Sequence, residues 1–406
     1  MKRIALPLAI ILLFIFQACN KADNSTENLQ PIAKTALNDL EFDEGEFQIM
    51  DLPVGMEYDL NQYFNRCLRM RSSTGVGYHI LIEDGVSDEY VYKVKQIFDM
   101  LLEEKPDSSF GSKKYMVKRS LAIQNCCFLL FANHENFDAK VKTFEASQLN
   151  YGACIIEETY LNGETDFIEH NRHDKAYKDV FSFIVKYGIK QGSPTFYEKI
   201  LRTTVDAITS HKYIPHPELN LDECASEYFS ILMDVYYGNW NYLSMDEHFE
   251  KYLYTSRFAM INNDQKGAEL ISDFLNPQIN ILNVITPGFL GSLSLQDISS
   301  YPYTNKTQFW NNVQLTGNSN SNVYGNDRDN LLIGNSGNNL FKSFSGDDII
   351  DGAEGFDKVL FDYDSDQTII EFHNDTVLLF NSNYGNDILI HVEQLVFENE
   401  TIDVMN

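Results

Sequence analysis

Residues 316–360 read TGNSNSNVY, GNDRDNLLI, GNSGNNLFK, SFSGDDIID and GAEGFDKVL, which are five nine-residue segments placed end to end. The sixth place of each segment is polar or acidic, and the eighth place is always apolar. The sixth-place residues are Ser321, Asn330, Asn339, Asp348 and Asp357, and the eighth-place residues are Val323, Leu332, Phe341, Ile350 and Val359. A fixed period of this kind predicts a coil of stacked repeats.

The composition of the segments favours tight turns that present oxygen atoms. Gly337, Gly346 and Gly355 stand at the fourth place of their segments, where glycine permits the positive φ angles of tight turns. Asn and Asp tolerate the same backbone region and supply side-chain oxygen. Because Ca²⁺ takes six to eight oxygen ligands from carboxylates and carbonyls, the turns are candidate calcium sites.

The five segments resemble the RTX calcium-binding nonapeptide, G-G-x-G-x-D-x-U-x. The resemblance implies a parallel β-roll (a β-solenoid) in which two nonapeptides complete one turn, so alternate segments stack. It implies one Ca²⁺ between the Asn330 and Asp348 turns and a second between the Asn339 and Asp357 turns. The metal-ligating residues that the resemblance implies are Asn330, Gly337, Asn339, Gly346, Asp348, Gly355 and Asp357.

The segments also depart from the family pattern. Ser321 stands in the first acidic place, and Arg328 replaces the fourth-place glycine of the second segment. Only Asp348 and Asp357 bring a carboxylate to the sixth place, so we expect weaker sites than in a full-consensus roll. An Asn/Gly-rich solenoid without calcium, or an unstructured linker, is the alternative reading of the same residues.

The segment 361–406 alternates between apolar and polar residues, which predicts short strands joined by hairpins at 373–375 and 384–386. It resembles the cap that follows RTX repeats in secreted proteins, and we expect an antiparallel β cap there. Before the roll, 288–315 is rich in Ser, Thr, Asn and Pro, which predicts a linker into the first turn.

The charge of the chain excludes one class of partner. The 406 residues carry a net charge of −28, and half of this excess lies in 316–406, which has 17 acidic and three basic residues. A chain with a pI near 4.6 offers no basic face to phosphates, so nucleic acid is not an expected partner. Acidic residues clustered beside glycine favour a divalent cation.

The N-terminus reads as a targeting segment. Residues 1–3 are basic at two positions, and 4–16 are apolar but too short to span a bilayer comfortably. The sequence FQAC at 16–19 resembles the bacterial lipobox, which implies a lipoprotein signal peptide over 1–18 and lipidation of Cys19. Acyl chains contribute about 0.8 kcal/mol per buried CH₂, so the resemblance implies an anchor in the cell envelope, at the outer membrane or cell surface.

Residues 19–47 are polar and acidic, which predicts a flexible tether. The other cysteines, at 67, 126, 127, 154 and 224, are odd in number and lie in apolar runs, so small buried hydrophobic residues are the expected role. No C-x-x-C spacing supports a thiolate zinc site.

The strand and helix patterns over residues 48–287 predict one mixed α/β domain. Strand patterns cover 77–82, 122–131 and 152–157, and helical spacing covers 87–104, 176–187, 196–208 and 222–237. Gly188 and Gly238 are expected to end two of the helices, and Asp222 to cap the last. The motif at 134–138, HENFD, is expected in a loop.

Two stretches of this domain resemble zincin metallopeptidases. Residues 171–188, NRHDKAYKDVFSFIVKYG, are similar to the active-site helix, and 223–230, ECASEYFS, to the later helix that carries a glutamate ligand. The motif H-E-x-x-H places two histidines on one helix face around zinc. Here the matching residues are Lys178, Asp179, Val180, Phe181 and Ser182, and Glu227 or Glu223 matches the third ligand.

Since neither histidine is present, we expect a catalytically degenerate, peptidase-like binding domain. The chain as a whole is then predicted to be a calcium-binding surface or adhesion lipoprotein with an unidentified ligand. The alternative is a metal-dependent peptidase or other hydrolase that uses Asp179, Glu227, His170 and His173, together with Asp174. A purely structural envelope lipoprotein is a third possibility.

Overall fold

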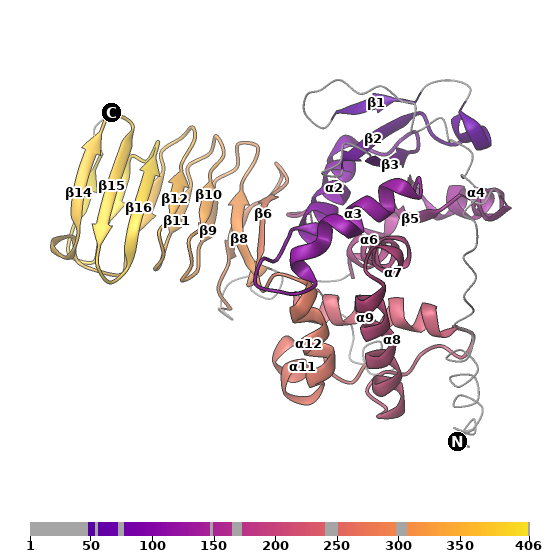
Figure 1. Ribbon diagram of the computed structural model, residues 1–406. Helices are drawn as coiled ribbons and strands as arrows, with labels where there is room; N and C mark the ends of the chain where they lie inside the picture. Colours follow the sequence, from indigo (N-terminus) through magenta and orange to yellow (C-terminus); the bar gives the residue numbers. More distant parts are fainter. Residues whose placement is uncertain are drawn as a thin grey trace, which may run out of the picture.

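The computed structural model describes residues 48–52, 56–71, 77–146, 149–164, 173–239, 251–297 and 307–404. The expected signal peptide (1–18), Cys19, the rest of the tether (19–47) and His170 lie outside the described residues. Among the described residues no helix is both long and apolar enough to cross a membrane. Figure 1 shows a mixed α/β part followed by an elongated, strand-rich C-terminal part.

The α/β part is built on a five-stranded sheet in the order β1-β2-β3-β4-β5. Its strands are β1 (Ile49–Asp51), β2 (Arg66–Arg71), β3 (Gly77–Ile82), β4 (Cys127–Phe131) and β5 (Tyr151–Ile155). The pairs β1–β2 and β2–β3 are antiparallel, and β3–β4 and β4–β5 are parallel. Every residue of β3 and β4 is buried, as a sheet covered on both faces requires.

Helices cover both faces of this sheet. The helical elements are η2 (Glu57–Gln62), α2 (Asp88–Leu102), η3 (Gly111–Lys113), α3 (Lys114–Ile123), α4 (His134–Ala146), η4 (Ile156–Glu158), α6 (Lys175–Phe183), η5 (Ile184–Ile189), α7 (Lys190–Gly192), α8 (Pro194–Thr209), α9 (Leu221–Tyr236), α11 (Arg257–Asn263) and α12 (Gln265–Phe274). On one face Phe128 of β4 meets Phe98 of α2 and Phe183 of α6 edge-on. On the other face Phe131 packs against Phe64 and Phe144.

Several expected boundaries differ from the observed ones. The strand expected over 122–131 begins at Cys127, because 114–123 form α3. The motif at 134–138 lies in α4 and not in a loop. Helix α9 is capped by Asn220, whose side chain accepts from the N–H of Glu223 while the Glu223 carboxylate accepts from the N–H of Asn220. This capping box, and not Asp222, defines the start of the helix.

Gly188 does not end the helix that begins at Lys175. The chain continues through the π-helical turn η5 into α7. A Cβ on Gly188 would lie 2.6 Å from the side chain of Val117 in α3. Close helix packing therefore explains this glycine, and packing of the continued helix outweighs the low helix propensity of glycine.

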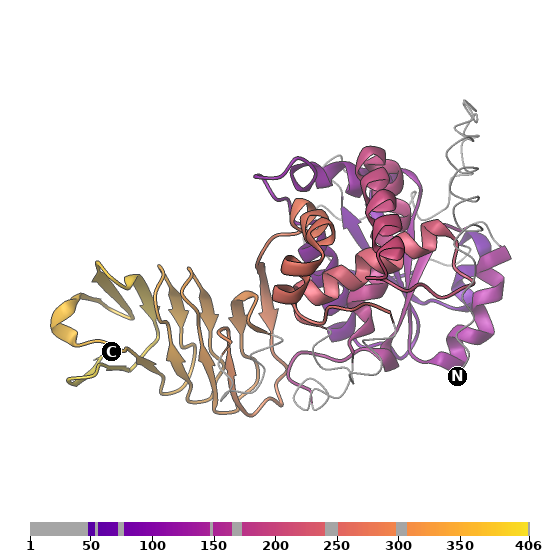
Figure 2. The same ribbon diagram turned by 90° about the horizontal axis from the view of Figure 1, so that it is seen from below.

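The C-terminal part is a coil with two parallel-stranded walls, seen from below in Figure 2. One wall has the order β14-β15-β16-β12-β10-β8-β6 and the other β18-β17-β13-β11-β9-β7. The strands are β6 (Ile279–Val284), β7 (Gly291–Ser294), β8 (Trp310–Gln314), β9 (Ser321–Tyr324), β10 (Leu331–Ile333), β11 (Leu340–Lys342), β12 (Ile349–Asp351), β13 (Lys358–Leu360), β14 (Ile369–His373), β15 (Thr376–Asn381), β16 (Gly385–Ile390), β17 (Gln394–Val396) and β18 (Thr401–Asp403). A short helical turn, η6 (Ser365–Gln367), follows β13.

The strand register shows that alternate segments stack. Phe341 of the third segment lies opposite Val323 of the first and Val359 of the fifth. Leu332 of the second segment lies opposite Ile350 of the fourth. All five eighth-place residues have an exposed fraction of 0%, so they form the interior between the two walls.

The coil extends on both sides of the nonapeptides. Strands β7 and β8 lie in the stretch expected to be a linker (288–315), and β7 pairs in parallel with β9. Beyond the repeats, β16 pairs in parallel with β12, and β17 pairs in parallel with β13. The outermost strands are antiparallel: β14 pairs with β15, β15 with β16, and β18 with β17. The expected β cap therefore contributes strands to the coil as well as covering it.

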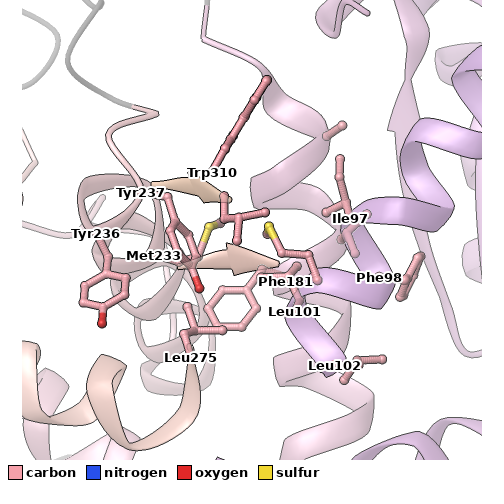
Figure 3. Packing of buried hydrophobic residues seen from close by; sticks show 14 of the residues in the cluster. Ile97, Phe98, Leu101, Leu102, Phe181, Met233, Tyr236, Tyr237, Leu275 and Trp310 are labelled. Carbon is pink, nitrogen blue, oxygen red and sulfur yellow. The ribbon is translucent and has the colours of Figure 1, made fainter. Parts of the chain in front are cut away.

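The first turns of the coil share a core with the α/β domain. Trp310 of β8 belongs to the buried cluster that contains Leu101 of α2 and Met233 of α9 (Figure 3). Gln96 of α2 donates a hydrogen bond to the carbonyl of Leu282 at 3.1 Å. The apolar interior is thus continuous from one part to the other.

Replacing Phe341 by Ala should destabilise the coil by about 3–5 kcal/mol, because it removes a fully buried ring between two stacked segments. Phe356→Ala is the matched control, since Phe356 is 43% exposed, and its effect should stay within about 1 kcal/mol. Chemical denaturation in the presence of calcium measures both. Equal losses of stability in the two variants would contradict the buried stacking of the eighth place.

Candidate calcium sites and the cavity of the α/β domain

The sixth-place side chains form two hydrogen-bonded columns, one along each wall of the coil. In the column of even segments, Oδ1 of Asp348 accepts from the N–H of Asn330 at 2.8 Å. In the column of odd segments, Oδ1 of Asp357 accepts from the N–H of Asn339 at 2.7 Å. The structure therefore brings together both pairs of residues that the sequence predicts to face each other.

Each column continues past the repeats. Oδ1 of Asp387 accepts from the N–H of Asp348 at 3.1 Å, and Oε2 of Glu393 accepts from the N–H of Asp357 at 2.7 Å. Asp387 lies in β16 and Glu393 just ahead of β17. Neither residue was predicted as a site residue, although both extend the acidic columns.

Two buried carboxylate oxygens have no hydrogen-bond partner among the described residues. They are Oδ2 of Asp348 and Oδ2 of Asp357, and the two residues are 1% and 0% exposed. A buried ionised oxygen without a partner is strongly unfavourable. A bound cation would satisfy it, so the donor set fits Ca²⁺.

The surroundings of Asp357 support the same fit. A Cβ placed on Gly352 would lie 2.7 Å from Oδ2 of Asp357 and 2.1 Å from the carbonyl oxygen of His391. A carboxylate and a backbone carbonyl thus converge on a space that the missing side chain leaves open. No group of three or more His, Cys, Asp or Glu side chains suited to a metal occurs among the described residues, so backbone oxygens must complete any calcium site here.

The fourth-place glycines allow successive turns to approach closely. A Cβ on Gly337, Gly346 or Gly355 would lie 2.5–2.6 Å from a carbonyl oxygen of the preceding turn. Gly346 and Gly355 also have φ angles of +122° and +133°, which residues with a side chain rarely adopt. These glycines therefore set the spacing between turns and expose the backbone oxygens.

Burial makes ionisation of the column carboxyls difficult. Desolvation, reinforced by the charge of Asp387, raises the pKa of Asp348 to about 8. Desolvation raises the pKa of Asp357 and of Asp387 to about 7, against the lowering effect of the hydrogen bonds that each accepts. Without a cation, these carboxyls hold protons near neutral pH.

The α/β domain contains a separate cavity of about 500 Å³ between β5, α6, α8 and α9. Its lining includes Lys178, Asp179, Ser182, Glu223 and Glu227. These are the residues at the three polar places of the zincin-like motif and both candidates for the later glutamate. The sequence-predicted pair Asp179 and Glu227 thus lines one cavity.

The charges in this cavity are already compensated in part. Glu227 accepts from Lys251 at 2.8 Å and from Tyr213 at 2.6 Å, and Lys178 lies 3.7 Å away. Burial raises the pKa of Glu227, but those two hydrogen bonds outweigh it and lower the pKa. Burial raises the pKa of Asp179 to about 7 against the opposing charge of Lys178.

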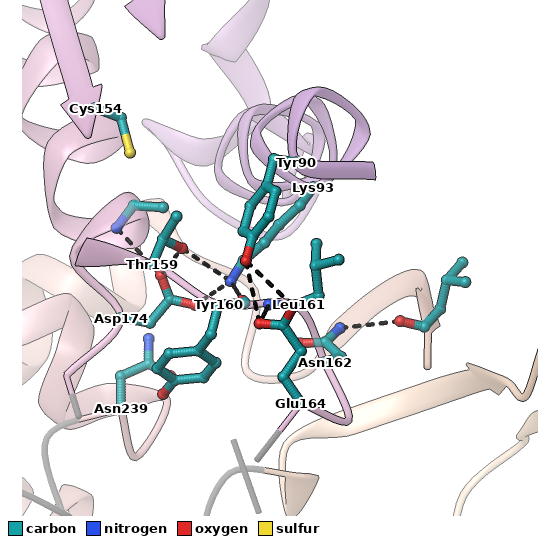
Figure 4. Close-up of polar contacts among 12 residues, drawn as sticks. Tyr90, Lys93, Cys154, Thr159, Tyr160, Leu161, Asn162, Glu164, Asp174 and Asn239 are labelled. Atoms are coloured by element: carbon teal, nitrogen blue, oxygen red, sulfur yellow. Dashed lines mark hydrogen bonds and ion pairs between the residues drawn. The ribbon is translucent and has the colours of Figure 1, made fainter. Parts of the chain in front are cut away.

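His173 and Asp174, the other described candidates for the metal-dependent hydrolase, both contact residues of the surrounding fold. Nε2 of His173 lies 3.0 Å from Oδ2 of the buried Asp234. Burial lowers the pKa of His173, but Asp234 outweighs this and raises it. Asp174 caps α6 and contacts Lys93 and Thr159 (Figure 4). His173 and Asp174 therefore stabilise the fold around the start of α6.

The described cysteines, at 67, 126, 127, 154 and 224, are buried free thiols, which confirms their expected role as small buried residues. Burial raises the pKa of Cys67 and of Cys224 to about 11. None of these thiols is therefore a ready nucleophile or metal ligand.

Comparison with known proteins identifies the repeat. Residues 324–359 match the RTX calcium-binding nonapeptide repeat in 4 copies. No curated protein matches the chain. The extracellular lipase LipA from Serratia marcescens aligns over 81% of this chain and 54% of its own, with 13% identity and a TM-score of 0.19. The chain spans about half the length of that lipase, and a likeness this distant supports no argument.

The match confirms the predicted RTX repeat, and RTX repeats indicate calcium binding. Proteins that carry them are typically extracellular or surface-associated. The C-terminal part is consistent with an RTX β-roll attached to a mixed α/β part.

In calcium-free protein, the stability of the coil should fall as the pH rises from 5 to 8. A carboxyl with a higher pKa in the folded chain than in the unfolded chain stabilises the fold at low pH, and this contribution is lost as the pH passes the folded value. For Asp348, Asp357 and Asp387 the loss extends from about pH 4 to pH 7–8. Thermal melts with chelator at pH 5 and 8 measure the change. A melting temperature that rises over this interval would contradict the expected ionisation.

Proposed function

We propose that this protein is a calcium-binding lipoprotein of the cell envelope that acts as a surface binding or adhesion module. The observation that carries the calcium-binding part of the proposal is the pair of buried oxygens, Oδ2 of Asp348 and Oδ2 of Asp357, that have no hydrogen-bond partner in the described part of the chain and lie in turns of an RTX repeat. They need a counter-charge before the coil can hold both carboxylates ionised. An environment with millimolar calcium supplies it even to weak sites.

Calcium then acts as a stabiliser of the folded coil. A ligand that binds the folded but not the unfolded chain stabilises it by RT ln(1 + [L]/Kd). Because the coil shares a buried cluster with α2 and α9, calcium that orders the coil also supports the α/β domain. A surface protein with this design is rigid outside the cell, where calcium is abundant.

The α/β domain is proposed to be a binding domain with a catalytically degenerate, zincin-like cavity. Support comes from the five lining residues at the motif positions. In this interpretation Lys178 places a cation at the position of the first histidine of the motif. The contact between Lys178 and Glu227 offsets the negative charge of Glu227, which matches the third zinc ligand. The cavity keeps a volume suited to a small ligand or a side chain.

A metal-dependent hydrolase is the second candidate. It is favoured by the pKa of Asp179, which at about 7 suits a general base. Against it stand the contacts of His173 with Asp234 and of Asp174 with Lys93, which engage two of the residues expected to hold the metal.

The metals that the purified protein retains, and its response to a chelator, distinguish these two proposals. After dialysis against calcium and zinc, the purified protein should retain calcium and no stoichiometric zinc, and chelation should lower its melting temperature. Asp348→Asn should weaken calcium binding, whereas Asp366→Asn, which removes an exposed carboxylate, should not. Stoichiometric zinc would favour the hydrolase. An unchanged melting temperature with chelator and no bound calcium would contradict the proposed function.

Lipidation of Cys19 is the other part of the proposal, and it rests on the lipobox-like sequence at 16–19. Cells grown with labelled palmitate should incorporate the label into the protein and retain it in the membrane fraction. Cys19→Ser should abolish both, because the acylated sulfur is lost. Wild-type protein that carries no palmitate label and is released into the medium would show that residues 1–18 are an ordinary signal peptide.

A further inference from the structure

The end of the chain repeats the core of a nonapeptide outside the matched residues 324–359. The sequence Gly-Asn-Asp-Ile-Leu at 385–389 has the pattern of Gly-Asp-Asp-Ile-Ile at 346–350. Strand β16 pairs in parallel with β12, so that Leu389 lies opposite Ile350. The intervening hairpin changes the spacing from 18 residues to 39, which hides the relation from a search for a nine-residue period.

The hydrogen bonds of this turn match those of the turn before it. The N–H of Asn386 donates to Oδ1 of Asp347 at 2.8 Å, as the N–H of Asp347 donates to Oδ1 of Asp329 at 2.9 Å. Gly385 has a φ angle of +107°, close to the +122° of Gly346. Asp387 therefore occupies the sixth place of an additional turn.

Asp387 brings a second carboxylate next to Asp348. Asp387 is 6% exposed and Asp348 1%, and Asp387 is the neighbouring charge that acts most strongly on Asp348. Two carboxylates at close range in a water-poor interior repel each other unless a cation lies between them. Within the nonapeptides, each implied site pairs one aspartate with one asparagine.

The turn of Asp387 also contacts the segment that contains Asp348. Oδ2 of Asp387 lies 3.4 Å from Oγ of Ser343, the first residue of the segment that contains Asp348. In the neighbouring column the first residue is Gly352, where Oδ2 of Asp357 and the carbonyl of His391 converge. Oδ2 of Asp348 is buried without a partner among the described residues, and the N–H of the same residue donates to Oδ1 of Asp387, so a cation between these two turns would satisfy that oxygen.

We propose that Asp348 and Asp387 hold a third calcium ion, between the turn at 343–348 and the turn at 381–387. The inference rests on the calcium binding of the proposed function. Because affinity rises with the number of charged ligands, this site should be the tightest of the three, although it lies outside the recognised repeats.

Asp387→Asn tests the site with little change of shape, since its side-chain oxygen can still accept from the N–H of Asp348. Calcium titration calorimetry on the purified full-length protein should show that the tightest binding equivalent of the wild type weakens to the affinity of the remaining sites, because the variant site also pairs one aspartate with one asparagine. The matched control Asp366→Asn, which removes an exposed carboxylate, should keep all equivalents.

Melting in chelator gives a second readout. Without calcium at pH 9, above the raised pKa of both carboxyls, Asp387→Asn should melt at a higher temperature than the wild type, because the buried repulsion with Asp348 is gone, and it should gain less on calcium addition. An unchanged affinity of the tightest equivalent, or an equal calcium gain in both proteins, would overturn the third site while leaving the proposed function intact. A wild type that binds no calcium would refute both.

Discussion

The structure depends on negative charge held inside the coil. Asp348 and Asp387 are buried in one column of turns and Asp357 in the other, and one oxygen each of Asp348 and Asp357 lacks a partner among the described residues. The apolar interior supplied by the eighth-place residues favours the coil, whereas the desolvated carboxylates oppose it once they ionise. Under the proposed calcium binding, a cation between the turns changes that opposing contribution into a favourable one, so order in the coil is expected to depend on calcium.

This dependence reaches the α/β domain because the two parts share one buried cluster. Trp310 and Val313 of the coil belong to the same cluster as Phe98 and Phe181 of the α/β domain. A coil that is ordered by calcium can therefore support the wall of the domain against which it packs. The cavity beside α6 lies on a sheet whose central strands are fully buried, which gives a binding site a rigid base.

The nine-residue period was sufficient to predict a coil of stacked repeats, because turn chemistry repeated at a fixed spacing produces one. The stacking of alternate segments was implied by the resemblance to the RTX roll. The period could not locate the ends of the coil. Strands β7 and β8 lack the glycine and aspartate pattern, and β16 is separated from β12 by a hairpin, so their pairing is decided by tertiary contacts. Asp387 was missed for this reason, although the Gly-x-Asp-x-Leu core at 385–389 was the available signal.

In the α/β domain the pattern located α2, α6, α8 and α9 and missed α3, α4, α11 and α12, and packing determined the limits of the helices. Gly188 continues a helix because its missing side chain admits Val117, and Asn220 defines α9 through a reciprocal hydrogen bond with Glu223 that spacing alone does not reveal. The pairing of His173 with Asp234 joins residues 61 positions apart, which no local pattern indicates. The cavity formed by Asp179 and Glu227 could be predicted only through the resemblance to a two-helix site.

The proposed cations neutralise the buried carboxylates between stacked turns. Anomalous diffraction from crystals grown with a lanthanide in place of calcium would locate them. Anomalous peaks are expected beside Oδ2 of Asp348 and Oδ2 of Asp357, between stacked turns of the coil. Well-ordered turns with no peak at either oxygen would contradict this proposal, because the carboxyls would then be satisfied by protons alone.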